Sequence, residues 1–321
     1  MTPRERGIEA LELRRPTGPV PSCELAFNLF SEWLGRPAPS LRGFEELDRD
    51  GQLRRLREFA PVAADVFRQM DHCIITFWAD GEDMATMLRV FRETVGDEFL
   101  LGFPADPTYG IPGGKNMLEY CWAFADRPAE MHDRAKRQVD EGLAVARRMR
   151  DAGGDTVWMG SDYAMNSGPF FSPEMFAEFV APYLKQVVGG FREIGLYVIK
   201  HTDGNINPIL DQIVDARPHA IHSLDTVAGI DIREVKEQYG DRVALIGNIP
   251  HGPLQQFKKD EIEEAARYCL TYGGVEQGGY IYGSSNAVFS NPGTEIGIDA
   301  YRFMLSVRDR FMTELRQKGR A

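Results

Sequence analysis

Short apolar or β-branched runs alternate along this chain with longer segments of helical period, and this alternation limits the fold more than any other feature. Such alternation is typical of right-handed βαβ units, which build a parallel sheet. Eight runs are predicted strands: Pro19–Glu24, Cys73–Trp78, Phe99–Phe103, Thr156–Gly160, Tyr197–His201, Ala220–Leu224, Val243–Gly247 and Tyr280–Gly283.

Helical segments separate most of these strands. They are Asp83–Val95, Glu130–Ala152, Pro173–Ile194, Pro208–Ala216, Ile232–Tyr239, Glu261–Tyr272 and a last helix, Glu295–Lys318. Eight strands with intervening helices predict an α/β fold, a single (β/α)8 TIM barrel with an N-terminal helical extension, and one domain spanning residues 1–321. An open doubly wound sheet is the rival architecture, but no GxGxxG turn follows the first strand.

Local signals support several of these boundaries. Ser172, Pro173 and Glu174 form a helix start, with a capping hydroxyl, a proline at the first helical position and an acid facing the dipole. Pro182 should kink the helix that follows. The segments 35–71 and 104–115 are less regular, and the second is predicted to be a long loop of the kind that is often functional.

The charge balance excludes some partners. A formal net charge of −11 argues against nucleic acid, because neutralising phosphates needs a basic surface. No apolar run approaches the roughly 18 residues of a membrane span, and the charged N-terminus lacks the apolar core of a signal peptide, so we expect a cytoplasmic protein. The four cysteines are scattered and are expected to be reduced and mostly buried: Cys23, Cys73, Cys121 and Cys269.

Polar side chains gather directly after the predicted strands, where a barrel of this kind carries its active site. The sharpest group is His201-Thr202-Asp203. At a period of two, residues 201 and 203 project to the same side of an extended chain. The pair could ligate a divalent metal, or Asp203 could orient His201 for acid–base catalysis. Alternatively, Asp203 and Asn205 simply form a turn and cap the next helix.

Asp162 follows the very apolar run TVWMG, where burial can raise its pKa or a cation can use its charge. It could equally accept backbone N–H bonds in its loop. Further substrate-binding candidates at strand ends are Glu24, Trp78, Tyr163, Asn166, Asn248 and Ser284. The remaining histidines are interpreted as structural: His72, His132, His219, His222 and His251.

Three stretches carry a resemblance to a known family: the opening MTPRERGIEALELRRP, residues 158–188 (WMGSDYAMNSGPFFSPEMFAEFVAPYLKQVV) and residues 200–249 (KHTDGNINPILDQIVDARPHAIHSLDTVAGIDIREVKEQYGDRVALIGNI). They resemble the uroporphyrinogen decarboxylase superfamily, and within it the cobalamin-linked methyltransferase (O-demethylase) branch. The resemblance is dense from about residue 156 to 250 and weak in 25–125. It implies a (β/α)8 barrel, often dimeric.

The superfamily covers two chemistries. Its true decarboxylases act on a porphyrinogen without a cofactor, and they resemble one another in paired arginines that grip the carboxylates of the substrate. The matching segment here, VPSCELAFNLFSEWLGRP, contains no arginine pair. A multiply anionic tetrapyrrole would therefore lack its cationic partners.

The methyltransferase branch binds zinc through a His-x-Cys pair and a later cysteine after the eighth strand. In the match, His201 takes the place of the histidine, Asp203 replaces the first cysteine, and Ser284 falls where the later cysteine would be. The resemblance thus implies a divalent metal such as zinc on His201 and Asp203. The third ligand stays open among Asp162, Asp225 and Glu24, and so does a site with no metal.

Three functions follow. The first is methyl transfer from a small methylated compound, such as an aromatic methyl ether, to a separate corrinoid protein that carries the cobalamin, with His201 and Asp203 on the metal and Asp162 positioning the substrate or shuttling a proton. The second is a metal-free lyase that decarboxylates a smaller acid, with Asp162 as the catalytic group. The third is a non-catalytic binding barrel, which the density of polar residues at the strand ends disfavours.

Overall fold

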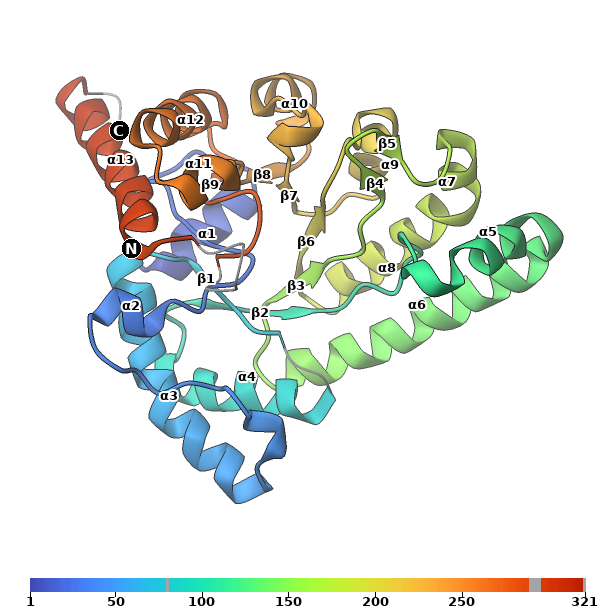
Figure 1. Ribbon diagram of the computed structural model, residues 1–321, viewed down its shortest axis with the longest axis horizontal. Coiled ribbons are helices and arrows are strands. Elements are labelled where there is room, and N and C mark those ends of the chain that lie inside the picture. The colour runs from blue at the N-terminus through green and yellow to red at the C-terminus, as the bar shows by residue number, and fades with distance from the viewer. Residues whose placement is uncertain (79–80, 289–295, 320–321) are drawn as a thin grey trace.

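A curled, fully parallel sheet forms the centre of the protein in a computed structural model that describes residues 1–78, 81–288 and 296–319 (Figure 1). Its seven strands lie in the order β1-β2-β3-β6-β7-β8-β9. Their bounds are β1 (Ile74–Thr76), β2 (Leu100–Pro104), β3 (Thr156–Met159), β6 (Tyr197–Thr202), β7 (Ala220–Ser223), β8 (Ala244–Ile246) and β9 (Tyr280–Ile281). A separate hairpin pairs β4 (Ala164–Met165) with β5 (Gly168–Pro169).

The first predicted strand, 19–24, is not a strand of this sheet. It forms isolated parallel bridges at one residue, Ser22, which pairs with His72 before β1 and with Tyr282 after β9. The amide of Cys23 donates to the carbonyl of Tyr282 (3.0 Å), and the amide of Cys73 donates to the carbonyl of Ser22 (2.7 Å). The expected eight-stranded barrel is therefore present as a seven-stranded, TIM-barrel-like sheet whose two edges meet at this short segment.

Helices surround the sheet on its outer side (Figure 1). Eight of them are the helices predicted between or after the strands, with α7 and α8 in place of one: α4 (Gly81–Val95), α6 (Pro128–Asp151), α7 (Pro173–Phe179), α8 (Ala181–Glu193), α9 (Leu210–Asp215), α10 (Ile232–Tyr239), α12 (Lys259–Tyr272) and α13 (Ile298–Gln317). The others are α1 (Pro3–Leu11), α2 (Phe30–Leu34), α3 (Arg49–Met70), α5 (Met117–Asp126) and α11 (His251–Gln256), with 3₁₀ turns η1 (Phe44–Glu46), η2 (Gly114–Asn116), η3 (Asn207–Ile209) and η4 (Thr226–Ala228). Glu295, the predicted start of the last helix, lies outside the described residues.

The helix expected over 173–194 is two helices. The hydroxyl of Ser172 accepts from the amide of Met175 and caps α7, as predicted. α7 ends at Phe179 and α8 begins at Ala181, with Val180 between them distorted (φ −116°, ψ −56°) but still in the right-handed helical region. Because proline lacks an N–H and crowds the preceding turn, Pro182 interrupts the expected helix at one residue.

The irregular segment 35–71 contains a helix that the sequence analysis did not predict. In α3, residues 53, 56, 60, 63, 67 and 70 follow a spacing of three and four, and all but Leu53 are buried. Asp48 caps the helix through the amide of Gly51. The apolar spacing of three and four is visible in the sequence, but Pro61 lies inside the helix, and proline usually ends or kinks a helix.

Alternate residues of the strands fill the inside of the curled sheet. This inner cluster includes Leu100, Trp158, Ile199, Ala220, Ala244 and Ile281. Helix α1 contacts β1 and β9, and its Ala10 and Leu11 join the same cluster. One end of the interior is thus closed by apolar packing, and the polar residues lie toward the other end.

Three arginines surround Asp155 directly before β3. Arg4 of α1 bonds both carboxylate oxygens (2.7 and 2.9 Å), Arg92 of α4 pairs with Oδ2, and Arg150 of α6 lies 3.3 Å from Oδ1. Burial acts to raise the pKa of Asp155, but the hydrogen bonds and charges of Arg4 and Arg92 lower it overall. This ion cluster fastens three helices to the sheet at the N-terminal ends of the strands.

The remaining global expectations have simple outcomes. Cys23, Cys73 and Cys269 are buried, and Cys121 is exposed on α5; all four are free thiols. Among the described residues, no helix has both the length and the apolar character needed to cross a membrane. The long loop expected over 104–115, after the third predicted strand, follows β2 and runs to η2.

Candidate functional site

His201 and Asp203 lie at the C-terminal end of β6 and project to the same side, as their spacing predicts. The side chain of Lys200, directly before His201, points to the opposite face, where Nζ bonds Asp106 (2.7 Å). The imidazole Nε2 of His201 lies 3.9 Å from Oδ1 of Asp203. The first two members of the predicted site therefore face one another.

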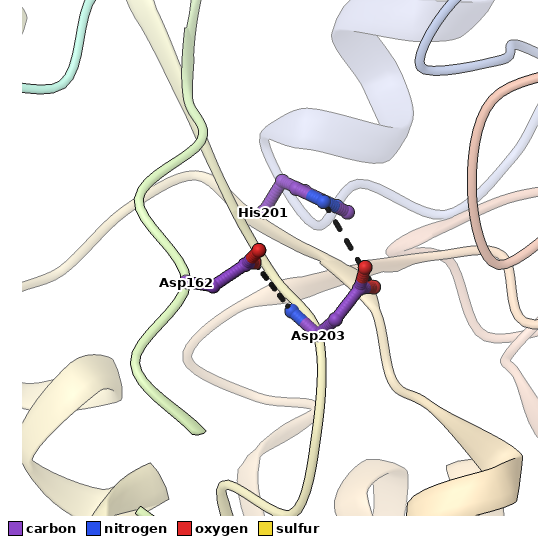
Figure 2. Close-up of side chains that lie close together, drawn as sticks. All are labelled: Asp162, His201 and Asp203. Atoms are coloured by element: carbon purple, nitrogen blue, oxygen red, sulfur yellow. Dashed lines mark hydrogen bonds and ion pairs between the residues drawn. The ribbon is translucent and has the colours of Figure 1, made fainter. Parts of the chain in front are cut away.

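Asp162 reaches the same point from the loop after β3, which pairs with β6. Its Oδ1 accepts a hydrogen bond from the amide of Asp203 (2.9 Å). One ligand atom from each of Asp162, His201 and Asp203 lies within 4.8 Å of the others (Figure 2). The sheet thus brings together the three residues proposed from sequence.

Two further side chains hold the carboxylate of Asp203. The hydroxyl of Ser223 donates to Oδ1 (2.6 Å), and the amide Nδ2 of Asn286 donates to Oδ2 (2.8 Å). Burial and the nearby charges of Asp162 and Asp225 raise the pKa of Asp203 to about 6, although the two hydrogen bonds act in the opposite direction. The carboxylates crowd one another, and a cation would relieve this.

A chain of hydrogen bonds fixes which nitrogen of His201 carries its proton. Nδ1 of His201 lies 2.8 Å from Nδ1 of His222, and Nε2 of His222 lies 3.3 Å from the backbone carbonyl of Ser284. A carbonyl can only accept, so His222 carries its proton on Nε2 and, when neutral, accepts at Nδ1. His201 then carries its proton on Nδ1.

Burial keeps both rings neutral. It lowers the pKa of His201 to about 3, with a further contribution from Lys200, and it lowers the pKa of His222 as well. The lone pair on Nε2 of His201 therefore faces a carboxylate oxygen of Asp203 with no proton between them. A divalent cation fits this arrangement, because neutral imidazole and carboxylate are ordinary ligands of zinc and related ions and 3.9 Å is close enough for one ion to reach both atoms.

The other two proposed third ligands lie elsewhere. Asp225 caps η4 through the amide of Val227 (2.9 Å) and accepts from the amide of Gly204 (3.3 Å). Glu24 is buried and accepts from the amide of Ser284 (3.2 Å to each oxygen). Within the described residues, the group that could hold a metal consists of Asp162, His201 and Asp203.

Some of the expected substrate-binding residues are occupied by internal contacts. Asn248 is buried and donates to the carbonyl of Leu224 (2.6 Å). Tyr163 is buried, with its hydroxyl 2.6 Å from Thr108 and its ring 3.9 Å from Nζ of Lys200. Ser284 is fully buried against Glu24. These positions favour a supporting role.

Two of the expected residues are accessible. Trp78 is 46% exposed at the end of β1, and its indole N–H donates to the carbonyl of Leu25 (2.9 Å). Asn166 is exposed at the turn of the β4–β5 hairpin. Both remain candidates for substrate contact, and neither belongs to the cluster of three.

Sequence reasoning missed the residues that support the site. His222 was interpreted as structural, yet it bonds His201; pairing of two adjacent parallel strands places these two residues opposite each other. Ser223 and Asn286 were not singled out as partners of Asp203. The buried ion pair of Lys200 and Asp106 was not predicted either. Asp106 accepts from the amide of Ser161 and Lys200 donates to its carbonyl, next to Asp162.

Residues 107–295 match the family model described as uroporphyrinogen decarboxylase (URO-D), which is more than half of the chain. The chain belongs to the uroporphyrinogen decarboxylase family. The superfamily predicted from the sequence motifs is therefore confirmed. The match starts after the first hundred residues, in agreement with the weak resemblance expected there.

Curated relatives match over part of their length. Uroporphyrinogen decarboxylase 2, chloroplastic, of Arabidopsis thaliana is 27% identical over 176 residues, which cover 52% of this chain and 43% of that protein. Uroporphyrinogen decarboxylase of Chlorobaculum tepidum is 25% identical over 198 residues, covering 58% and 53%. The chain spans about half the length of the curated relatives it matches.

A solved methyltransferase from Methanosarcina mazei has a similar fold. It superposes with a TM-score of 0.72 over 97% of this chain and 99% of that chain, at 17% sequence identity. At this identity the likeness establishes the shared fold over nearly the whole length.

Proposed function

We propose that this protein is a metal-assisted methyltransferase that moves a methyl group from a small methoxy compound to a corrinoid protein. The observation that carries the proposal is the unprotonated Nε2 of His201 facing Oδ1 of Asp203, with Asp162 beside them. Nitrogen and oxygen donors at this spacing suit a divalent ion, and zinc is the first candidate. The similarity in fold to the M. mazei methyltransferase supports the same class of reaction.

The residues around the proposed metal site would have different roles. His201 and Asp203 would hold the ion, and His222 fixes the tautomer that leaves Nε2 of His201 free. Ser223 and Asn286 orient the carboxylate of Asp203. Asp162 would position the substrate. When bound, the ion would act as a Lewis acid toward the oxygen that leaves as the methyl group is transferred.

The charge of the site favours a small substrate without many carboxylates. Asp162, Asp203 and Asp225 all lie near the C-terminal ends of the strands, and the buried cation Lys200 is paired with Asp106 on the other face of β6. A porphyrinogen with several carboxylates would be repelled at close range. A neutral or singly charged methoxy compound avoids this cost.

Metal content is the first test. Purified protein should contain or bind about one zinc ion per chain, and His201→Ala or Asp203→Ala should remove it. Asn166→Ala, an exposed change outside the cluster, serves as the matched control. A protein that binds no divalent ion would eliminate this mechanism.

Activity is the second test. Incubating the zinc-loaded protein with 2-methoxyphenol and cob(I)alamin should form methylcobalamin, read from its absorbance, and H201A should not. The second candidate function is a metal-free decarboxylase, which the relatives named uroporphyrinogen decarboxylase favour. Release of CO2 from a carboxylic acid in the presence of EDTA would support it. A homodimer and a cytoplasmic location remain predictions of the sequence.

A further inference from the structure

Glu24 is an acid buried without a basic partner. It follows the Ser22 bridge that joins the two edges of the sheet, and its residue is 3% exposed. Within the described residues, no lysine, arginine or histidine forms an ion pair with it at 4.0 Å or less. Its hydrogen-bond partners are the amide and hydroxyl of Ser284 and the hydroxyl of Tyr301. An ionised carboxylate here would be a buried, uncompensated charge.

Counting hydrogens around Ser284 places a proton on Glu24. The hydroxyl of Ser284 has one hydrogen. Its oxygen lies 2.7 Å from the backbone carbonyl oxygen of Asn286, which can only accept. The same oxygen is in close contact with Oε2 of Glu24. Because a single hydroxyl hydrogen cannot fill both contacts, the hydrogen between Ser284 and Glu24 comes from the carboxyl group.

The electrostatics agree with this count. Burial raises the pKa of Glu24 to about 8, although the hydrogen bonds from Ser284 and Tyr301 act in the opposite direction. The other titratable or charged groups around this position are Cys23, His72, His251, Tyr282, Tyr301 and Arg308. At neutral pH the proton therefore remains on the carboxyl group.

Ser284 connects this acid to the cluster of Asp162, His201 and Asp203. Asn286, whose carbonyl accepts from Ser284, donates its side-chain amide to Oδ2 of Asp203 (2.8 Å). The backbone carbonyl of Ser284 contacts His222, which bonds His201. The hydroxyl of Ser284 thus stands between Glu24 and the side chains that support the proposed metal ligands.

We propose that Glu24 is kept as a neutral carboxylic acid and that, through Ser284, it holds Asn286 in place against Oδ2 of Asp203. The positioning role rests on the proposed function, whereas the neutral state does not. Glu24 donates to Oγ of Ser284, the hydroxyl of Ser284 donates to the carbonyl of Asn286, and the side-chain amide of Asn286 donates to Asp203. Because the acid carries no charge, it adds no repulsion to the carboxylates of Asp162 and Asp203.

The neutral state is tested by the pH dependence of unfolding, without metal or substrate. Unfolded Glu24 ionises near its ordinary pKa, whereas folded Glu24 keeps its proton until about pH 8, so the wild-type protein loses stability as pH rises between these values. Glu24→Gln removes this loss, because glutamine is a neutral isostere that can still donate to Ser284. The unfolding constant of the wild type relative to E24Q, from urea titrations in EDTA, should rise about tenfold per pH unit from about 5.5 to 7.5.

The exposed Glu45 in η1 provides the matched control. The ratio of the wild type to Glu45→Gln gives the background effect of the same exchange at an exposed position, and the ratio for E24Q is compared with it. A ratio for E24Q no steeper with pH than this background would show that Glu24 is already ionised in the folded protein and would overturn the proposal.

The positioning role is tested by zinc binding and by turnover of 2-methoxyphenol with cob(I)alamin. Ser284→Ala breaks the hydrogen-bond chain to Asn286 and should weaken zinc binding about 10-fold, as loss of a supporting partner does. E24Q can still donate to Ser284 and should stay within about threefold of wild type in zinc affinity and turnover. Unchanged zinc affinity in S284A would overturn the positioning role. A wild type that binds no zinc and transfers no methyl group would overturn the proposed function and the positioning role together, and the unfolding ratio would still decide the protonation of Glu24.

Discussion

Two buried carboxylates at opposite ends of the same sheet have opposite electrostatic surroundings. Asp155, before β3, is surrounded by Arg4, Arg92 and Arg150, and its pKa is lowered. Glu24, at the end where the strands finish, forms no ion pair within the part of the chain that the structure describes, and its pKa is raised to about 8. The first carboxylate is charged and compensated, and the second is kept neutral.

The difference in surroundings corresponds to a difference in role, because one carboxylate stabilises the fold and the other belongs to the candidate site. In barrels of this type, residues at the N-terminal ends of strands serve stability and residues at the C-terminal ends serve catalysis. Asp155 joins α1, α4 and α6 to the sheet, so its charges are used in the fold. Glu24 and Asp203 cost stability, and perturbed groups of this kind cluster at functional sites.

The largest expected effect is on Asp155. Asp155→Ala leaves three arginines facing one another without their common carboxylate, and we expect a loss of about 3–5 kcal/mol in the free energy of unfolding. Urea unfolding measures it. A loss below about 1 kcal/mol would mean that this end of the sheet does not depend on the ion cluster, and the contrast between the two ends would fail.

At the other end, His201→Ala should cost about 1–3 kcal/mol in the metal-free protein, because it leaves Nδ1 of the buried His222 without its donor, and it should weaken zinc binding more than about 100-fold. Titration calorimetry with zinc gives the affinity, and urea unfolding in EDTA gives the stability. If the variant bound zinc as tightly as the wild type, His201 would not be a ligand.

His222 should have a smaller effect. His222→Leu removes the acceptor that fixes the proton on Nδ1 of His201, and loss of such a supporting partner weakens metal binding about 10- to 100-fold. The tautomer of His201 in the metal-free wild type can be read directly from ¹⁵N–¹H long-range NMR correlations. A proton found on Nε2 of His201 would contradict the hydrogen-bond chain.

The smallest effect belongs to Arg150. Its side chain is 41% exposed, so its bond to Asp155 is screened by solvent and Arg150→Ala should cost less than about 1 kcal/mol in urea unfolding. Arg4→Ala, from a 21% exposed side chain that bonds both oxygens, should cost more. Equal losses of unfolding free energy in the two variants would show that the contribution of each arginine does not depend on its burial.

Much of this arrangement was predictable from local pattern. The alternation of apolar runs and helical segments predicted the seven strands of the sheet, and the period of two predicted that His201 and Asp203 face the same side. Because parallel strands end at one edge, Asp162 could be placed beside them before any coordinates were known.

The rest depends on register and on contacts between distant segments. Nothing local in IHS predicts that His222 bonds His201, because that contact requires the pairing of β6 with β7. The partner of Glu24 is 260 residues away, at Ser284. The first predicted strand has the composition of a strand, but it bridges the sheet at one residue, which pattern alone does not reveal.

An early segment around Ser22 meets a late segment around Tyr282 where the two edges of the sheet come together. This contact sets an order of assembly during synthesis. Until residue 282 has left the ribosome, β8 lacks its neighbour β9 and the segment around Ser22 can pair only with the β1 side. A nascent chain at that stage exposes unpaired strand edges, the kind of surface on which chaperones and aggregation compete. Glu24 on the closing segment reaches Ser284 only when the gap is filled, so the closed sheet and the contact between the acid and its serine form in the same step.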